Sequence, residues 1–218
     1  MKRCSDWQLY AIIDRDAIGH RDMPATAAAA IRGGADVIQL RDKTASVRQL
    51  TEEAAKLLLV TQRYGVPLIV NDRLDVAQAV GADGVHVGQD DLPLEAARAL
   101  LGEDAIIGRS THSLEQAFAA VAGGADYIGL GPVFSTPTKP AYGPVGTALI
   151  RQVMPRVRIP VVCIGGIDAG NLPEVLEAGA TCAAVIRAIC SADDPESAAR
   201  TLKQILAQSS RSTHSPSL

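Results

Sequence analysis

Residues 33–43 read Gly-Gly-Ala-Asp-Val-Ile-Gln-Leu-Arg-Asp-Lys, and this stretch contains the unit from which the fold follows. A glycine pair after an alanine-rich segment is typical of a helix end, because glycine readily adopts the left-handed backbone conformation there. Val37 and Ile38 form an apolar run of the kind found in buried strands. Polar residues follow, from Gln39 to Lys43. The stretch therefore predicts a helix end, a turn, a strand and a polar strand end in succession.

Similar units recur along the whole chain. Related turns are Gly81-Ala82-Asp83, Gly123-Gly124-Ala125-Asp126 and Gly179-Ala180-Thr181. Apolar runs with a polar or glycine-rich end occur eight times, over residues 9–13, 37–38, 67–70, 84–87, 106–108, 127–130, 161–164 and 183–186. Alternation of strands with helices indicates a parallel sheet, and eight units favour its closure into a single (β/α)8 TIM barrel. A flavodoxin-like open sheet is the alternative, but it needs fewer strands.

The 218 residues are expected to form one barrel domain over residues 1–207 and a disordered tail over residues 208–218. The tail consists mostly of Ser, Thr, Gln, Pro and His, so it offers little apolar surface to a core. Hydrophobic residues make up 47% of the chain but aromatic residues only 3%. The core is therefore expected to be aliphatic.

Composition also excludes several classes of function. A net charge of −3 and few aromatic residues argue against nucleic-acid binding. We find no apolar stretch long enough to cross a membrane and no secretory signal. The four cysteines form no C-x-x-C pair, which fits reduced thiols in a cytoplasmic protein. We expect small-molecule substrates and a monomer or homodimer, between which the sequence does not decide.

Carboxylates follow two neighbouring predicted strands. Asp72 ends the third strand and Asp91 follows the fourth, so a barrel brings both to one rim. Mg²⁺ in proteins is often held by one or two carboxylates together with substrate phosphate and water. The alternative is helix capping, because an aspartate before Leu92-Pro93 is well placed as an N-cap. One of Asp90 and Asp91 is expected to cap and the other to bind metal, and the spacing leaves open which.

Two further segments are suited to anionic groups. Gln39, Arg41 and Lys43 share one face of an extended segment, and three converging donors suit a polyanion such as pyrophosphate. A solvated charged loop is the alternative, which the continued alternation out of a buried strand disfavours. The loop Thr136-Pro137-Thr138-Lys139 offers hydroxyls, amides and a lysine to a phosphate, although its prolines also suit an ordinary turn.

The last two predicted strands end in Gly165-Gly166 and in Ile186-Arg187. Backbone N–H groups after these strands form the phosphate site of many TIM barrels. His86 and His112 are interpreted as structural, hydrogen-bonded residues, and the sequence shows no zinc-like spacing of His and Cys.

Taken together and in this order, the motifs resemble the thiamine-phosphate synthase family over residues 9–206. They are Q-L-R-D-K at 39–43, N-D-R at 71–73, H-V-G-Q-D-D at 86–91, G-R-S-T-H at 108–112, G-P-V-F-S-T-P-T-K at 131–139 and I-G-G-I at 164–167. The resemblance implies a Mg²⁺-dependent transferase on a (β/α)8 barrel. Such an enzyme joins an aminopyrimidine pyrophosphate to a thiazole phosphate and releases pyrophosphate.

The resemblance also implies a role for each site residue. The pyrimidine pyrophosphate would be held by Gln39, Leu40, Arg41, Asp42, Lys43, Asn71, Ser110 and Lys139. Asp72 and Asp91 would bind Mg²⁺, which leaves Asp90 as the cap or as a supporting residue. The thiazole phosphate would be held by Thr136, Pro137, Thr138, Gly166, Ile186 and Arg187. Catalysis would fall to Arg41, Lys43, Ser110 and Lys139, which assist the departure of pyrophosphate.

Two alternatives and one departure accompany this resemblance. A related thiazole tautomerase, an isomerase, has a catalytic histidine near the end of strand six, where this chain has Pro132. A non-catalytic phosphate-binding barrel would not need both Asp72 and Asp91. The departure is Arg187, because the family most often has serine there.

Overall fold

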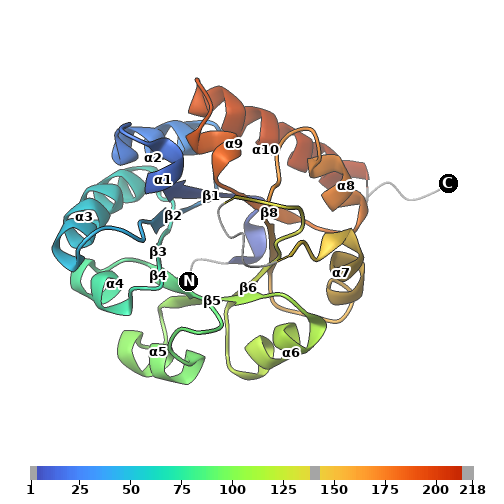
Figure 1. The fold of residues 1–218 in the computed structure, drawn as a ribbon, viewed down its shortest axis with the longest axis horizontal. Helices are drawn as coiled ribbons and strands as arrows, with labels where there is room; N and C mark the ends of the chain where they lie inside the picture. The colour runs from blue at the N-terminus through green and yellow to red at the C-terminus, as the bar shows by residue number, and fades with distance from the viewer. Residues whose placement is uncertain (1–3, 138–142, 213–218) are drawn as a thin grey trace.

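The computed structural model describes residues 4–137 and 143–212, without the side chains of residues 210–212. Within these residues, eight parallel strands close into a barrel in chain order, which Figure 1 shows end-on. The strands are β1 (Leu9–Asp14), β2 (Val37–Arg41), β3 (Leu68–Asn71), β4 (Gly84–Val87), β5 (Ile106–Thr111), β6 (Tyr127–Leu130), β7 (Val161–Ile164) and β8 (Cys182–Val185). Since β8 pairs with β1, the predicted barrel is confirmed and the open sheet is wrong.

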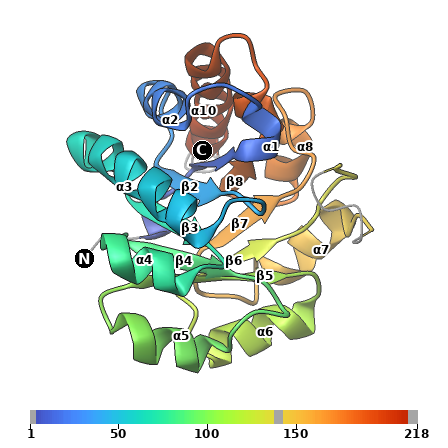
Figure 2. The ribbon, with the colours of Figure 1, turned by 60° about the vertical axis from the view of Figure 1, so that its left-hand side comes forward.

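Helices cover the outside of this barrel (Figure 2). A short 3-10 turn, η1 (Cys4–Asp6), precedes β1. The helices are α1 (Arg15–Ile18), α2 (Met23–Arg32), α3 (Val47–Tyr64), α4 (Leu74–Val80), α5 (Leu94–Leu101), α6 (Leu114–Ala122), α7 (Gly146–Val153), α8 (Leu172–Glu177), α9 (Arg187–Cys190) and α10 (Pro195–Ser212). Among the described residues, none of these helices is long and apolar enough to cross a membrane.

The first and last long helices lie side by side and close the outer layer (Figure 1). A Cβ atom on Gly33 would lie 2.4 Å from the backbone oxygen of Glu196, so only glycine allows α10 to approach the end of α2 this closely. Arg32 and Glu196 add an ion pair of 2.7 Å. Because α10 continues to Ser212, the predicted start of the tail at residue 208 is wrong, and residues 213–218 lie outside the described part.

Apolar residues form two cores. The larger one lies between the strands and the helices and is aliphatic, as expected. The smaller one fills the amino-terminal half of the barrel interior, and there the expectation is wrong. Its centre is aromatic: the Trp7 ring packs edge-on against Tyr10 and Tyr127, with ring centroids 5.8 and 5.3 Å away. Few aromatic residues are present, but three of them meet in the floor of the barrel.

The repeated Gly-Ala-Asp turns prove to link neighbouring strands. In three of them the aspartate accepts a hydrogen bond from a backbone N–H near the start of the preceding strand and returns one to the same residue. The pairs are Asp36 with Leu9, Asp83 with Leu68 and Asp126 with Ile107. We call these three contacts the strand-start clamps. They fix the register of β1 with β2, β3 with β4 and β5 with β6.

Candidate active site

A cavity of about 390 Å³ opens at the carboxyl ends of the strands. Inward-facing side chains of the strands form its floor, and the loops after β6, β7 and β8 form one wall. The predicted site residues that line it are Gln39, Arg41, Asn71, Ser110, Thr136, Pro137, Gly166, Ile186 and Arg187. The structure therefore brings together residues that span almost 150 positions of sequence.

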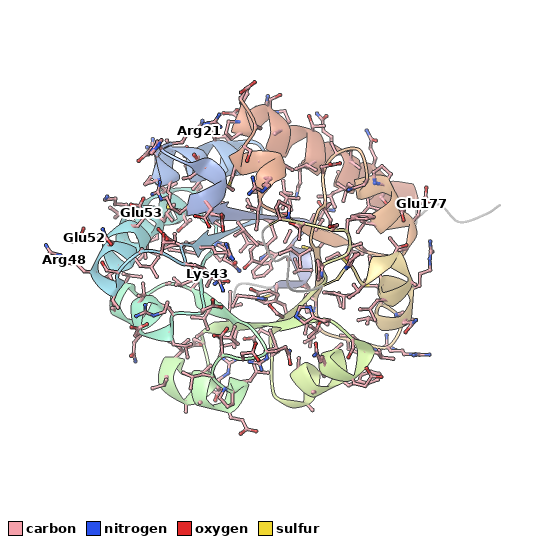
Figure 3. The ribbon with its side chains drawn as sticks, viewed as in Figure 1. Arg21, Lys43, Arg48, Glu52, Glu53 and Glu177 are labelled. Carbon is pink, nitrogen blue, oxygen red and sulfur yellow. The ribbon has the colours of Figure 1, made fainter. Side chains whose placement is uncertain are left out.

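The predicted cationic face leads from this cavity to the rim. Gln39 and Arg41 are buried at the cavity wall, while Lys43 is half-exposed and lies 3.5 Å from a carboxylate oxygen of Asp72. In Figure 3 the side chain of Lys43 points towards the barrel axis. Arg41 is held by Asp14, whose buried carboxylate accepts a hydrogen bond from the guanidinium and another from the Ala17 N–H. The sequence analysis missed Asp14, which orients Arg41 and also caps α1.

Two other residues of the 39–43 motif point elsewhere. Leu40 is completely buried in the outer core, so its side chain cannot reach the cavity and only its backbone is available to a substrate. Asp42 accepts hydrogen bonds from Thr44 and Ala45 and thereby shapes the loop after β2. Partial burial raises the pKa of the Asp42 carboxyl, but these bonds and the nearby Arg15 outweigh it, and the pKa lies below its ordinary value. The ionised Asp42 carboxylate therefore stabilises the loop after β2.

Asp72 has an unusual backbone conformation. Its φ of 61° makes it the sole described residue other than glycine with a positive φ. Its N–H donates to the backbone oxygen of His86, so the chain turns sharply at the end of β3 while remaining bonded to β4. Such strained positions concentrate at functional sites, and aspartate tolerates this conformation better than most residues. The turn holds the carboxylate at the rim beside Lys43.

Asp91 lies in the loop after β4, and the capping interpretation is wrong for both aspartates there. Helix α5 begins at Leu94 with Pro93 as its N-cap and no side-chain cap. The Asp91 carboxylate instead accepts a hydrogen bond of 2.6 Å from the Gly88 N–H within its own loop.

A residue that the sequence analysis did not single out braces this loop. Arg109 on β5 donates to the backbone oxygens of Gln89 and Leu92, at 3.0 and 3.2 Å, on either side of the two aspartates. Arg109 is next to Ser110 but faces away from the cavity. Its contacts depend on the path of the β4–α5 loop, which the sequence does not predict.

Asp72 and Asp91 are the described carboxylates that could hold a magnesium ion shared with a substrate. Asp72 and Asp91 follow adjacent strands that pair in register. No group of three or more His, Cys, Asp or Glu side chains that could hold a metal occurs within the described residues. Two hard oxygen ligands completed by phosphate and water are a common arrangement for Mg²⁺, so this donor set suits the ion once a phosphate-bearing substrate is present.

The other end of the cavity is built from backbone. Gly165 and Gly166 follow β7 with φ values of 105° and 63°. A Cβ atom on Gly166 would lie 2.7 Å from the backbone oxygen of Ser135, so the loop after β6 packs directly on this glycine pair. Ile186 and Arg187 lie at the start of α9, where the first N–H groups have no acceptor within the helix. Thr138 and Lys139 lie outside the described residues.

The floor of the cavity contains polar residues that the sequence analysis either missed or interpreted only as structural. His86 is hydrogen-bonded, as predicted, but it faces the cavity: its Nε2 lies 2.9 Å from the Ser110 hydroxyl and its Nδ1 lies 3.0 Å from the Tyr127 hydroxyl. Tyr10 lies behind them, also lining the cavity. The alternation of side chains along a strand could have predicted this, because Tyr10, His86 and Tyr127 all occupy inward-facing positions of their strands. His112, also predicted as structural, contacts the backbone oxygen of Gly131 through its Nδ1 and lines the cavity.

Comparison with known proteins gives a consistent result. The family model described as thiamine monophosphate synthase matches residues 9–189. A thiamine-phosphate synthase of Chloroflexus aurantiacus is 50% identical over 202 residues, covering 92% of this chain and 93% of that protein. One of Shouchella clausii is 50% identical over 206 residues, covering 94% and 99%. The solved structure of a thiamine phosphate pyrophosphorylase from Pyrococcus furiosus superposes with a TM-score of 0.86 at 39% identity, covering 93% and 96%.

Proposed function

Since the chain belongs to the thiamine monophosphate synthase family, we propose that its rim cavity joins an aminopyrimidine pyrophosphate to a thiazole phosphate. The family makes it a transferase of thiamine biosynthesis. The roles of the site residues and the metal requirement are part of this proposal. One observation supports it: Arg41, Asn71 and Ser110 line the same cavity as the glycine-rich loop after β7 and the start of α9.

The pyrimidine pyrophosphate occupies the end of the cavity near β2, β3 and β5. Arg41 and Lys43 offer positive charge there, and Asn71 and Ser110 offer neutral hydrogen bonds. The bond between the pyrimidine methylene and pyrophosphate can break early, because an electron-rich aminopyrimidine stabilises the cation that forms. Cationic side chains that are already in position before the reaction then stabilise the negative charge that builds on the departing pyrophosphate. The thiazole nitrogen attacks the methylene, so no protein nucleophile is required.

Asp72 and Asp91 hold Mg²⁺ in this proposal, and Lys43 beside Asp72 faces the same pyrophosphate. When bound, the ion supplies Lewis-acid neutralisation of the pyrophosphate oxygens. Arg109 keeps the Asp91 loop in place through its two backbone contacts. Lys139 completes the predicted cation set, although it lies outside the described residues.

The thiazole phosphate occupies the cup between the loops after β6, β7 and β8. Thr136 and Pro137 from the first loop, Gly166 from the second and Ile186 with Arg187 from the third surround it. Backbone donors at this place are pre-oriented by the glycine pair and need no side-chain charge. Binding the two substrates from opposite ends brings the reacting nitrogen and methylene together, and this proximity supplies much of the rate.

The test is an assay with both heterocycles and Mg²⁺ that follows pyrophosphate release and thiamine phosphate formation. We expect release only when both substrates are present. Release from the pyrimidine pyrophosphate alone would identify a hydrolase, and conversion of the thiazole alone would identify an isomerase; either result would contradict the proposal. The isomerase has less support, because Pro132 follows β6 where a catalytic histidine is expected. A cytoplasmic location and a monomeric or dimeric state remain predictions from the sequence.

A further inference from the structure

Five polar side chains from five strands form a continuous hydrogen-bonded chain across the floor of the cavity. It runs from Gln39 to Tyr10, then to Tyr127, His86 and Ser110, with successive distances of 2.7, 2.9, 3.0 and 2.9 Å. We propose that this chain, called here the floor relay, fixes His86 as its neutral Nε2–H tautomer and makes the Ser110 hydroxyl a donor towards the pyrimidine pyrophosphate. Tyr10, Tyr127 and His86 are then positioning residues for the reaction.

The direction of the floor relay follows from its first member. Nε2 of the Gln39 amide faces Tyr10, and an amide nitrogen can only donate. The Tyr10 hydroxyl has one proton, and within the described residues its other hydrogen-bond partner is Tyr127. Donation from Tyr10 to Tyr127 satisfies both groups, whereas the opposite direction would leave the buried Tyr10 proton without an acceptor, which is costly.

The remaining protons are then determined. The Tyr127 hydroxyl donates to Nδ1 of His86, so Nδ1 carries no proton. A neutral imidazole must then carry its proton on Nε2, which donates to Oγ of Ser110. Because Oγ already accepts from His86 and Ser110 lines the cavity, its own proton is directed to a ligand.

Burial keeps the two phenols protonated, as the floor relay requires. Tyr10 and Tyr127 are 2% and 1% exposed. Burial raises the pKa of Tyr10, with hydrogen bonds from its neighbours opposing this in part, and burial likewise raises the pKa of Tyr127 well above its ordinary value.

Two glycines make room for the floor relay. A Cβ atom on Gly108 would lie 2.1 Å from Cζ of Tyr127, and one on Gly129 would lie 3.1 Å from Cε1 of His86. Gly108 and Ser110 both occupy inward positions on β5, so the same strand makes space for the Tyr127 ring and supplies Ser110, the last member of the relay. The barrel floor is therefore shaped around these rings and holds them in a single arrangement.

A donor at Ser110 is best used on the departing pyrophosphate. A donor to the pyrimidine ring would withdraw electron density and oppose the developing cation, whereas a donor to a pyrophosphate oxygen stabilises the leaving group. This last step rests on the proposed function, but the tautomer of His86 does not, because it is a property of the protein without substrate.

The first experiment is therefore made on the full chain without ligand. Nitrogen-15 NMR of labelled histidine distinguishes the two neutral tautomers and the imidazolium, and a His86→Gln variant assigns the His86 signals among the four histidines. We expect the Nε2–H tautomer at pH 8. An Nδ1–H tautomer or a doubly protonated ring would overturn the proposal.

A single substitution can reverse the floor relay. Gln39→Glu replaces the amide donor with a carboxylate acceptor of nearly the same size, so at pH 9 Tyr10 should donate to residue 39. Each later bond then reverses, and we expect His86 to change to the Nδ1–H tautomer. Retention of the Nε2–H tautomer would show that Gln39 does not set the direction.

Kinetics test the link to Ser110. Tyr127→Phe should lower kcat about tenfold, the scale of one hydrogen bond, with the KM for thiazole phosphate unchanged. Ser110→Ala in the Tyr127→Phe background should add little further loss, because in this proposal each change removes the donation from Ser110 to the pyrophosphate. Additive losses would overturn the coupling. Tyr64→Phe, which removes a hydroxyl from a part-exposed tyrosine of α3, is the matched control.

The two kinds of measurement separate two kinds of failure. If the wild-type protein forms no thiamine phosphate, the proposed function fails while the NMR result still decides the floor relay. If Tyr127→Phe does not fold, Gln39→Glu tests the same relay by NMR with both tyrosines in place. A single unchanged tautomer in that variant would contradict the proposal.

Discussion

The strained backbone of Asp72 places a carboxylate at the rim of the barrel. Asp72 turns the chain with a positive φ directly after β3, and its backbone remains bonded to β4. Asparagine shares the tolerance of aspartate for this conformation. Replacing Asp72 with asparagine therefore tests the charge of the side chain and leaves the turn intact.

The metal proposal predicts unequal effects at three aspartates. Asp72→Asn and Asp91→Asn should each lower turnover by orders of magnitude, because each removes a carboxylate ligand of Mg²⁺. Asp90→Asn is the matched control in the same loop and should be much milder. Rates across a Mg²⁺ titration and Mn²⁺ binding by calorimetry would measure this. Equal and small effects at all three positions would contradict the assignment.

Arg187 is the site residue at which the chain departs from its family. It lies at the start of α9 and lines the cavity, so its backbone N–H serves the cup whatever its side chain. Its guanidinium adds a charge-assisted contact of about 1.5–3 kcal/mol where it reaches the phosphate. Arg187→Ser should leave the enzyme active with an unchanged or moderately higher KM for thiazole phosphate.

Steady-state kinetics with thiazole phosphate varied would measure that change, and the exposed Arg158→Ser is the control for loss of an arginine. A large gain in activity of Arg187→Ser would mean that the arginine obstructs the cup. The protein would then have diverged from the chemistry of its family.

At the scale of elements, the strand-start clamps explain why the Gly-Ala-Asp repeat appears in the sequence. Each glycine ends a helix, and each aspartate then ties the new strand to the start of the previous one. Arg98 contacts the Asp126 carboxylate at 2.7 Å, and Lys203 contacts Asp36 in the same way. The fourth copy has Thr181 in place of aspartate and so lacks the carboxylate that forms the clamp in the other three.

Removing one clamp should destabilise the barrel measurably. Asp126→Ala leaves the Ile107 N–H without its acceptor and Arg98 without its carboxylate, at a cost of about 1–3 kcal/mol. Urea unfolding at pH 7 would measure the change in free energy. Asp104→Ala, an exposed aspartate on the loop before β5, should stay within about 0.5 kcal/mol of wild type. Equal effects of the two substitutions would show that the clamp contributes nothing.

At the scale of the whole molecule, the closed barrel buries groups that ionise at high pH. Burial raises the pKa of the Cys163 thiol from its ordinary value of 9.0 to about 12 and that of Cys190 to about 11. Above pH 9 the unfolded chain loses these protons while the folded chain keeps them. The stability that they contribute is complete below pH 9 and is lost as the pH rises towards the folded values.

The free energy of unfolding should therefore fall between pH 8 and pH 10, by about 1.4 kcal/mol for each such thiol. Urea unfolding under reducing conditions at both pH values would measure it. Cys163→Val keeps an apolar side chain but removes one titrating thiol. Over the same pH range, the free energy of unfolding of this variant should therefore fall by about 1.4 kcal/mol less than that of the wild type. The same fall in wild type and variant would contradict the assignment.

The sequence by itself determined the repeating unit, the eight strands and the polar strand ends, because strand alternation and helix-ending glycines are local properties of the chain. It also placed Gln39, Arg41 and Ser110 at the cavity, since the topology of a parallel barrel collects all strand ends on one rim. Only the tertiary structure decided which of these groups meet. Asp14 holds Arg41, Arg109 braces the Asp91 loop, and Tyr10, Tyr127 and His86 join in one relay. These contacts join residues far apart in the chain, and their distances depend on how the closed barrel packs.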